Sequence, residues 1–300
     1  MFNCILLHTI RKYLTSGLDR IVNFIFHELS SHFSLHFRYI ANLDKNMTIS
    51  YQVLGQGKPL IIIHGLFGTS DNLKQIAKSL SDQYKVFLID APAHGDSTTP
   101  TPLTINTMAK AVIEFADEQG LKQFSLLGHS LGGKIAMEIA LLDNSRVERL
   151  VVADIAPVQY SHRHDNIIQG LNSINLATLE NRQQADETLS QFIDEVGVRG
   201  FLLKSLTRAE KPATGWRWRF DLQALEQNYD NLIKGNSELV FQGPTLFIVG
   251  GNSNYVLPEH KPEIVARFPK VSVKVIQNAG HWLHAEKATA FIKICRDFLA

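Results

Sequence analysis

From residue 47 onward, short apolar runs alternate with segments in which apolar residues recur at helical spacing. The runs at 59–65, 85–92, 124–130 and 147–157 are typical of buried strands, and 71–84, 103–120 and 131–143 between them have the helical period. After residue 240 the pattern resumes, with apolar runs at 244–251 and 271–280 and helical segments at 258–268 and 287–299. This alternation predicts an α/β fold, a mostly parallel central sheet flanked by helices on both faces.

The stretch from 158 to 240 interrupts the alternation. Its segments 164–174, 185–197, 199–208 and 220–235 have helical spacing, and we recognise no strand run among them. We therefore expect a core made of residues 47–157 and 241–300, into which residues 158–240 are inserted as a helical cap.

The first 46 residues stand apart from this pattern. They begin apolar and reach Arg11 and Lys12 only afterwards, which is the reverse of a secretory signal, and no cleavage-site pattern follows. No uninterrupted apolar run reaches the roughly 18 residues of a membrane span. We treat residues 1–46 as an extension of uncertain status, either dispensable or upstream of a true start at Met47.

Composition narrows the classes of function. The chain has 300 residues, of which 45% are hydrophobic and 20% charged, with a formal net charge of +1. A net charge this small gives the molecule no overall electrostatic field that would attract nucleic acid or an anionic membrane. The two cysteines, Cys4 and Cys295, lie far apart and outside any CxxC pattern, which suits a reducing, cytoplasmic location. Cys295 lies on an apolar helical face and is expected in the core.

We expect no metal and no cofactor. The 12 histidines show no ligand spacing such as HExxH, and no GxGxxG follows a strand. The oligomeric state does not follow from the sequence, and a monomer is the starting expectation.

The strongest chemical signal is Gly128-His129-Ser130-Leu131-Gly132, which matches G-x-S-x-G between a predicted strand and a predicted helix. A nucleophile elbow requires this context, because the serine sits on a strained turn that leaves room only for glycine neighbours. Such a turn exposes the hydroxyl at the carboxyl end of the sheet, where open α/β folds bind ligands. Ser130 is the candidate nucleophile.

A serine hydroxyl needs a base. His281 follows the last predicted strand, after small residues, and is the best candidate. His284 is expected in the first turn of the last helix and His129 in buried packing.

The tetrahedral intermediate needs two N–H donors for its oxyanion. We assign the backbone N–H groups of Leu131, after the nucleophile, and of Leu66, in the His64–Gly68 loop after the first buried strand. A plain glycine turn is the alternative for that loop. The side chains of Asp90, His94 and Ser97, after the next strand, are expected to be structural.

The base also needs a carboxylate that orients it. The turn after the 244–251 strand, its usual place, offers Asn252, Ser253 and Asn254, and Glu259 is expected to open a helix. One strand earlier, Asp154 ends an apolar run, where burying a carboxylate is costly without a partner. Asp154 therefore either receives the His281 N–H, which we favour, or caps the first turn of the insertion.

These motifs, in this order, resemble the α/β-hydrolase superfamily. The stretches DIAPVQY, WRWRF, GGNSNYV and AGHWLHAEK are similar to a subfamily of bacterial esterases, over about residues 47–300. The resemblance implies Asp154 as the triad acid, assisted by Ser253. It also implies short-to-medium acyl esters as substrates, with acyl-CoA possible.

The chemistry expected of Ser130 is attack on an ester or thioester, with an acyl-enzyme that water releases, which makes the protein a carboxylic ester hydrolase of the serine type. Dehalogenation and epoxide opening on this fold use an aspartate nucleophile, so Ser130 argues against both. A carbon–carbon bond hydrolase or lyase with the same triad stays open. A non-enzymatic ligand-binding module is the less favoured alternative.

The cap is expected to set specificity. Some of its large apolar residues could line an acyl pocket or equally form the cap's own core: Leu202, Leu203, Trp216, Trp218 and Phe220. Binding of a CoA substrate would require basic side chains that pair with its phosphate groups. The candidates, with solvated surface as the default interpretation, are Arg163, Arg199, Lys204, Arg217 and Arg219.

Overall fold

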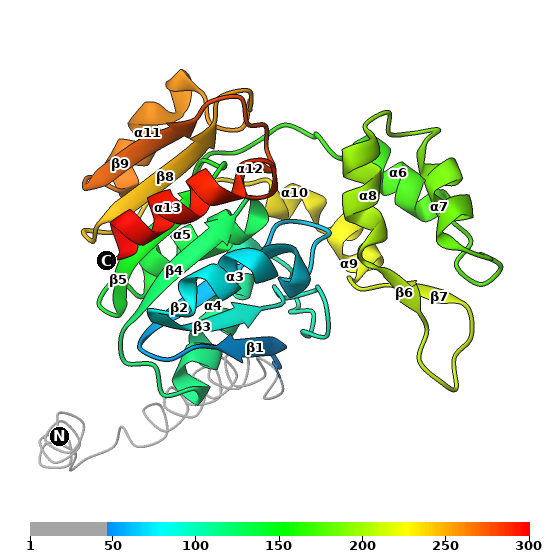
Figure 1. Ribbon diagram of the computed structural model, residues 1–300, viewed down its shortest axis with the longest axis horizontal. Coiled ribbons are helices and arrows are strands. Elements are labelled where there is room, and N and C mark those ends of the chain that lie inside the picture. The colour runs from blue at the N-terminus through cyan, green and yellow to red at the C-terminus, as the bar shows by residue number, and fades with distance from the viewer. Residues whose placement is uncertain (1–46) are drawn as a thin grey trace, which may run out of the picture. The chain divides into compact units, whose positions relative to one another are not determined.

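The computed structural model of the chain describes residues 47–300. The expectations about residues 1–46, including Cys4, lie outside this part of the chain. A sheet of seven strands runs through it in the order β1-β3-β2-β4-β5-β8-β9 (Figure 1). These strands are β1 (Tyr51–Leu54), β2 (Lys58–Ile63), β3 (Tyr84–Ile89), β4 (Phe124–His129), β5 (Val147–Ala153), β8 (Thr245–Gly250) and β9 (Val271–Ile276). All neighbours pair in parallel except β1, which is antiparallel to β3, so the predicted mostly parallel sheet is confirmed.

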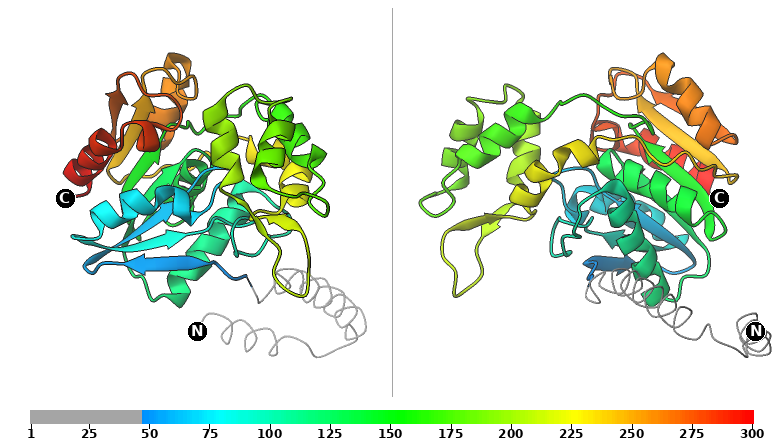
Figure 2. Two further views of the ribbon diagram at one scale, coloured as in Figure 1. Left: turned by 45° about the vertical axis from the view of Figure 1, so that its right-hand side comes forward. Right: turned by 180° about the vertical axis from the view of Figure 1, so that it is seen from behind.

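Helices cover both faces of the sheet (Figure 2). One layer contains α3 (Lys74–Leu80) and α13 (Ala288–Leu299), and the other contains α4 (Ile105–Glu118), α5 (Leu131–Leu142) and α11 (Lys261–Arg267). Alternate residues of β2 belong to opposite layers, Leu60 and Ile62 to the first and Ile61 and Ile63 to the second, and all four are fully buried. Two covered faces explain why the strands read as continuous apolar runs.

Short elements complete the core: the 3-10 helices η1 (Ser70–Leu73) and η2 (Pro258–His260), and α12 (Leu283–Glu286). Cys295 lies on α13 and is fully buried in the first layer, as expected.

The insertion between β5 and β8 is mostly helical but not wholly so. It contains α6 (Asp165–Ser173), α7 (Arg182–Leu189), α8 (Val196–Leu203), α9 (Leu222–Gln227) and α10 (Tyr229–Leu232), together with β6 (Leu206–Arg208) and β7 (Trp216–Trp218). The expectation of an insertion without strands was therefore wrong. The predicted helix over 199–208 ends at Leu203, and the one over 185–197 is interrupted between Leu189 and Val196.

Trp216-Arg217-Trp218 alternates apolar and polar residues with a period of two, which favours a strand. This strand, β7, pairs antiparallel with β6, and Trp218 lies opposite Leu206. Trp218 is buried, whereas Arg217 keeps part of its surface exposed.

The insertion contacts the core at the loops that follow the carboxyl ends of the strands. Ser205 Oγ donates to Phe67 O at 2.9 Å, and the Asp221 N–H donates to Ala93 O at 2.9 Å. The insertion therefore faces the edge of the sheet at which parallel α/β folds bind ligands (Figure 2). No helix within residues 47–300 has the length and apolar character needed to cross a membrane.

Candidate active site

Ser130 lies on a strained turn between β4 and α5. Its backbone angles, a φ of 52° and a ψ of −120°, fall outside the regions preferred by residues other than glycine. The turn passes so close to its neighbours that a Cβ on Gly128 would lie 2.1 Å from Gly132 O, and one on Gly132 would lie 2.3 Å from Ile63 O. Only glycine fits at these two positions, so the G-x-S-x-G spacing has a steric cause.

A continuous hydrogen-bonded chain runs from this serine to a buried carboxylate. His281, in the loop after β9, places Nε2 at 3.0 Å from Ser130 Oγ and Nδ1 at 2.7 Å from an Asp154 oxygen. Because the carboxylate only accepts, the Nδ1 proton points to Asp154, which leaves Nε2 free to accept the serine proton. This is the geometry in which a histidine acts as the base of a serine nucleophile.

Asp154 follows β5 and is completely buried, with a φ of 53°. Its carboxylate accepts the Gly250 N–H at 2.9 Å and a short hydrogen bond from the Ser253 hydroxyl, besides the His281 contact. Three donors compensate the burial of the charge. These partners favour the orienting role over the alternative, in which Asp154 would cap the insertion's first turn.

The pairing of neighbouring strands explains how the acid can follow β5 instead of β8. Ala153 pairs with Ile248 of β8, and the Asp154 N–H donates to Ile248 O at 2.9 Å. The carboxyl ends of β5 and β8 therefore lie side by side, and a side chain from either end can reach the His281 ring.

Residues of the turn after β8 contact both Asp154 and His281. Ser253 bonds to Asp154, the Tyr255 N–H donates to Ser253 Oγ at 3.3 Å, and the Tyr255 ring stacks on the His281 ring with centroids 3.7 Å apart. The two rings are 14° from parallel. Sequence reasoning missed Tyr255, although it belongs to the distinctive GGNSNYV stretch.

The loop after β2 passes close to Ser130, since a Cβ added to Gly65 would lie 3.2 Å from Ser130 Cβ. In this loop the Phe67 N–H donates to His94 Nε2 at 3.1 Å and the Gly68 N–H donates to Gly65 O at 3.1 Å. Leu66 lines the same cavities as Ser130, and Leu131 lines one of them. Since the amides of Phe67 and Gly68 are engaged, we assign Leu66 as the residue of this loop that completes an oxyanion hole with Leu131.

Two buried histidines support that loop. His64 Nε2 accepts the Ala91 N–H at 2.9 Å, so its proton is on Nδ1, directed at Gly65 O. His94 likewise accepts at Nε2 and donates from Nδ1 to Pro92 O at 3.0 Å. Burial lowers the pKa of His64 and lowers the pKa of His94 to about 3, so both rings are neutral structural groups.

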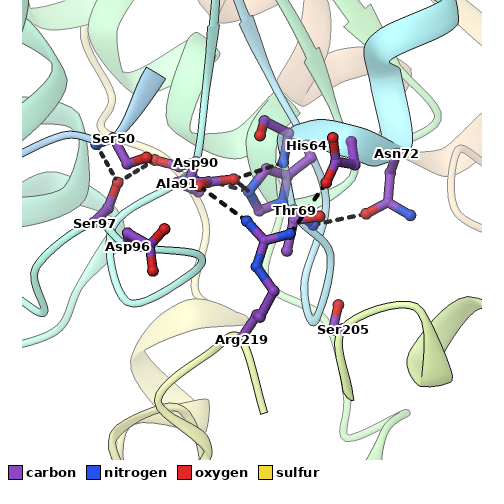
Figure 3. A network of polar contacts seen from close by, with 12 residues as sticks. Ser50, His64, Thr69, Asn72, Asp90, Ala91, Asp96, Ser97, Ser205 and Arg219 are labelled. Carbon is purple, nitrogen blue, oxygen red and sulfur yellow. Dashed lines mark hydrogen bonds and ion pairs between the residues drawn. The ribbon is translucent and has the colours of Figure 1, made fainter. Parts of the chain in front are cut away.

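Figure 3 shows the polar network around the ends of this loop. The Asp90 carboxylate accepts the Ser70 N–H at 2.7 Å, while Ser97 Oγ donates to Asp90 O at 2.7 Å and accepts the Ser50 N–H. Arg219, from the insertion, lies 3.8 Å from Asp90 and 3.1 Å from Asp71. Asp90, His94 and Ser97 thus hold loops together, and Arg219 ties the insertion to them.

Two further histidines pack behind His281. His129 is buried and donates from Nε2 to the His281 carbonyl at 2.8 Å. The His284 ring lies 4.3 Å from the His129 ring, and burial lowers the pKa of His284 to about 3. His129 is therefore a packing group that also fixes the backbone of His281, which agrees with its expected burial.

Two cavities meet at Ser130. The first has a volume of about 40 Å³ and is lined by residues that include Ser130, Leu131, Ile155, Tyr160, Tyr229 and Leu232. The second also has a volume of about 40 Å³ and is lined by residues that include Ser130, Ile167, Val198, Leu202, His281 and Trp282. Leu66 and His164 contribute to both.

Of the insertion residues expected to line a pocket, only Leu202 borders either cavity. Trp216 donates its indole N–H to Leu179 O at 2.8 Å, and Trp218 stacks on Phe220 with centroids 5.4 Å apart. Phe220 in turn packs against Phe67. Trp216 and Trp218 thus pack within the insertion and Phe220 packs where the insertion meets the core, while the aromatic wall of the first cavity consists of tyrosines that sequence reasoning missed.

The candidate cations do not form a cluster. Arg199 pairs with Asp186 at 2.8 Å, Arg217 with Glu210 at 3.1 Å, and Arg219 with Asp71 and Asp90. Arg163 lies over the Tyr160 and Tyr255 rings and lines the first cavity, whereas Lys204 lines a separate hollow beside Leu203. The expectation of plain solvated surface is therefore wrong for Arg199, which is buried in its ion pair.

Lys134 was not singled out by the sequence analysis. This buried side chain, one turn after Ser130, donates to Val158 O at 2.9 Å and to Lys234 O, where the insertion leaves and rejoins the core. Burial lowers its pKa to about 7. The only signal in the sequence for this role was the position of the lysine, just inside the helix that follows G-x-S-x-G.

Among the described residues, no group of three or more His, Cys, Asp or Glu side chains is arranged to hold a metal ion.

Comparisons with known proteins agree with the fold. Residues 58–288 match the family model described as alpha/beta hydrolase fold. The chain is 36% identical to Esterase YbfF of Escherichia coli K12 over 242 residues, which cover 80% of this chain and 92% of that protein. It is 34% identical to the mouse sn-1-specific diacylglycerol lipase ABHD11 over 266 residues, 85% of this chain and 86% of that one. Among solved structures, a marine microorganism esterase superposes with a TM-score of 0.81 at 35% identity, covering 84% of this chain and 100% of its own.

Proposed function

The chain belongs to the α/β-hydrolase family, and from that premise we propose that it is a serine esterase that hydrolyses carboxylic esters through an acyl-enzyme on Ser130. The observation that carries the proposal is the hydrogen-bonded chain from Ser130 Oγ through His281 to the buried Asp154, with contacts of 3.0 and 2.7 Å. Relatives named as an esterase and a lipase support ester hydrolysis.

The reaction starts with attack of Ser130 Oγ on the ester carbonyl carbon while its proton passes to His281 Nε2. The Leu66 and Leu131 N–H groups donate hydrogen bonds to the oxyanion of the tetrahedral intermediate. As the bond to the leaving group breaks, the Nε2 proton passes to the leaving oxygen, which departs as the alcohol. Water then attacks the acyl-enzyme, gives a proton to Nε2, and releases the carboxylic acid and Ser130.

Asp154 keeps the imidazole in the required tautomer and stabilises the imidazolium that forms twice per cycle. Ser253 assists by donating to the same carboxylate. Ser253 lies in the turn after β8, which is the usual place of the catalytic acid, and from there it holds the Asp154 carboxylate in position.

The substrates that the proposal assigns are short-to-medium acyl esters. Acyl-CoA thioesters are a narrower version of the proposal, and the pairing of Arg199, Arg217 and Arg219 with carboxylates weighs against it, because those cations are already engaged. The proposal includes residues 158–240 as a cap over the site, a cytoplasmic location and a monomeric protein.

A covalent probe tests the proposal directly. Treatment of the folded protein with a fluorophosphonate should label Ser130, as located by peptide mass spectrometry, and the Ser130→Ala variant should stay unlabelled. p-Nitrophenyl esters and a set of acyl-CoA thioesters, assayed in parallel, then separate esterase from thioesterase activity. Folded wild-type protein that neither reacts with the probe nor hydrolyses any ester would overturn the proposal.

A further inference from the structure

The two cavities that meet at Ser130 are not equivalent with respect to His281. His281 borders the second cavity and does not border the first, although Ser130 borders both. Leu66 and His164 contribute to both linings and therefore lie where the cavities meet. An ester bound at Ser130 has two arms, the acyl chain and the leaving group, and each cavity can accept one.

Proton transfer decides which arm enters which cavity. His281 Nε2 must donate to the leaving oxygen, so that oxygen has to come within about 2.6–3.2 Å of this nitrogen. The leaving group then extends from that point into space bordered by His281, which is the second cavity. The acyl chain takes the remaining direction from the tetrahedral carbon, into the first cavity, which Leu131 borders.

On these grounds we propose that the second cavity is the leaving-group pocket and the first cavity is the acyl pocket, with Leu202 and Leu232 as the matching specificity-determining residues. The inference rests on the proposed esterase function and adds a substrate class to it. Leu202 stands on α8 in the wall of the second cavity, and Leu232 stands on α10 in the wall of the first. Both leucines are buried in the insertion.

The lining of the second cavity defines the leaving group further. Apolar side chains such as Phe67, Ile167, Phe201 and Trp282 line it beside three histidines and Ser130, and the described residues contribute no Lys, Arg, Asp or Glu to it. A charged group carried into such a pocket would lose its hydration without gaining an ion pair. The part of the leaving group next to the scissile bond is therefore an uncharged alcohol or thiol.

Two ester series separate the pockets. The acyl series holds p-nitrophenol constant and lengthens the acid from acetate to decanoate. The alcohol series holds the acetyl group constant and lengthens the alcohol from methanol to octanol, with acid release followed by pH-stat. In each series the measured quantity is the ratio of kcat/KM for the longest and the shortest ester.

Leu232→Phe and Leu202→Phe form a matched pair. Leu232→Phe should lower the long-to-short ratio in the acyl series roughly tenfold, the scale of a one- or two-carbon mismatch in an apolar pocket, and leave the ratio in the alcohol series nearly constant. Leu202→Phe should lower the ratio in the alcohol series and spare the acyl series. If a phenylalanine variant does not fold, Leu232→Ala and Leu202→Ala test the same assignment with the opposite sign.

The reverse pattern, both variants acting on one series, or no change in either ratio would overturn the pocket assignment while ester hydrolysis itself persisted. Failure of the wild-type protein to hydrolyse any member of either series would instead contradict the proposed function.

Discussion

Acid should destabilise this protein through buried neutral histidines. Burial lowers the pKa of His94 and His284 to about 3 and that of His164 to about 4. In the unfolded chain the same side chains bind protons below pH about 6.5. The unfolded state therefore binds more protons than the native state under mildly acidic conditions, and stability falls as pH decreases from 6.5 toward 4.

The size of the loss follows from the pKa values. Each such histidine contributes about 1.4 kcal/mol for each pH unit below 6.5, which amounts to about 2 kcal/mol between pH 7 and pH 5. His94, His164 and His284 together give about 6 kcal/mol, which compares with total stabilities of about 5–15 kcal/mol for ordinary domains. His64 and His129, whose pKa values burial also lowers, act in the same direction.

His284 is the best position for the test, because its Nδ1 has no hydrogen-bond partner among the described atoms and its ring packs between His129 and Phe291. His284→Phe should reduce the loss of unfolding free energy between pH 7 and pH 5 by about 2 kcal/mol, measured by urea unfolding at half-unit pH steps. His162→Gln is the control. His162 is exposed, and hydrogen bonds to Asp230 and Asp165 raise its pKa, so its removal should not reduce the acid sensitivity. An unchanged pH dependence in His284→Phe would refute the reasoning.

Two other substitutions, Gly132→Ala with Gly200→Ala as its control and Tyr255→Leu, test the packing around the nucleophile and its base. Gly132→Ala should lower the unfolding free energy by about 3 kcal/mol, because its Cβ would meet the Ile63 carbonyl, whereas Gly200→Ala, in open space on α8, should raise it by about 0.5–1 kcal/mol in the same urea assay. Equal effects of the two substitutions would contradict the steric account of the elbow. Tyr255→Leu should lower kcat for a p-nitrophenyl ester roughly twofold to tenfold, since a stacked ring pair is worth about 0.5–1.5 kcal/mol. No change in kcat would show that the stack does not help to hold His281.

The features that were predictable from the sequence are those whose signal is local. Buried parallel strands read as apolar runs because helices cover both faces, and the elbow has a fixed spacing because Gly128 and Gly132 leave no room for a Cβ. The position of Asp154 beside His281 followed from placing it at the carboxyl end of a buried strand.

Features that depend on contacts between distant segments were not predictable in this way. Trp218 and Phe220 looked like pocket residues because they are large and apolar, but only the fold decides that they pack on each other. The partners of Lys134 at 158 and 234 come from opposite ends of the insertion, which no spacing reveals. The β6–β7 hairpin was missed because three-residue strands give too short a periodic signal, although the Trp-Arg-Trp alternation was visible.

We propose above all that the triad's acid is Asp154, directly after β5, and that Ser253 only supports it. The most direct test is kcat for one p-nitrophenyl ester in two variants. Asp154→Asn should lower kcat about 10³–10⁴-fold, as a wrong tautomer does, and Ser253→Ala should lower it only about tenfold. If Ser253→Ala were the more damaging substitution, or if Asp154→Asn kept near-normal kcat, the assignment of the acid would be wrong.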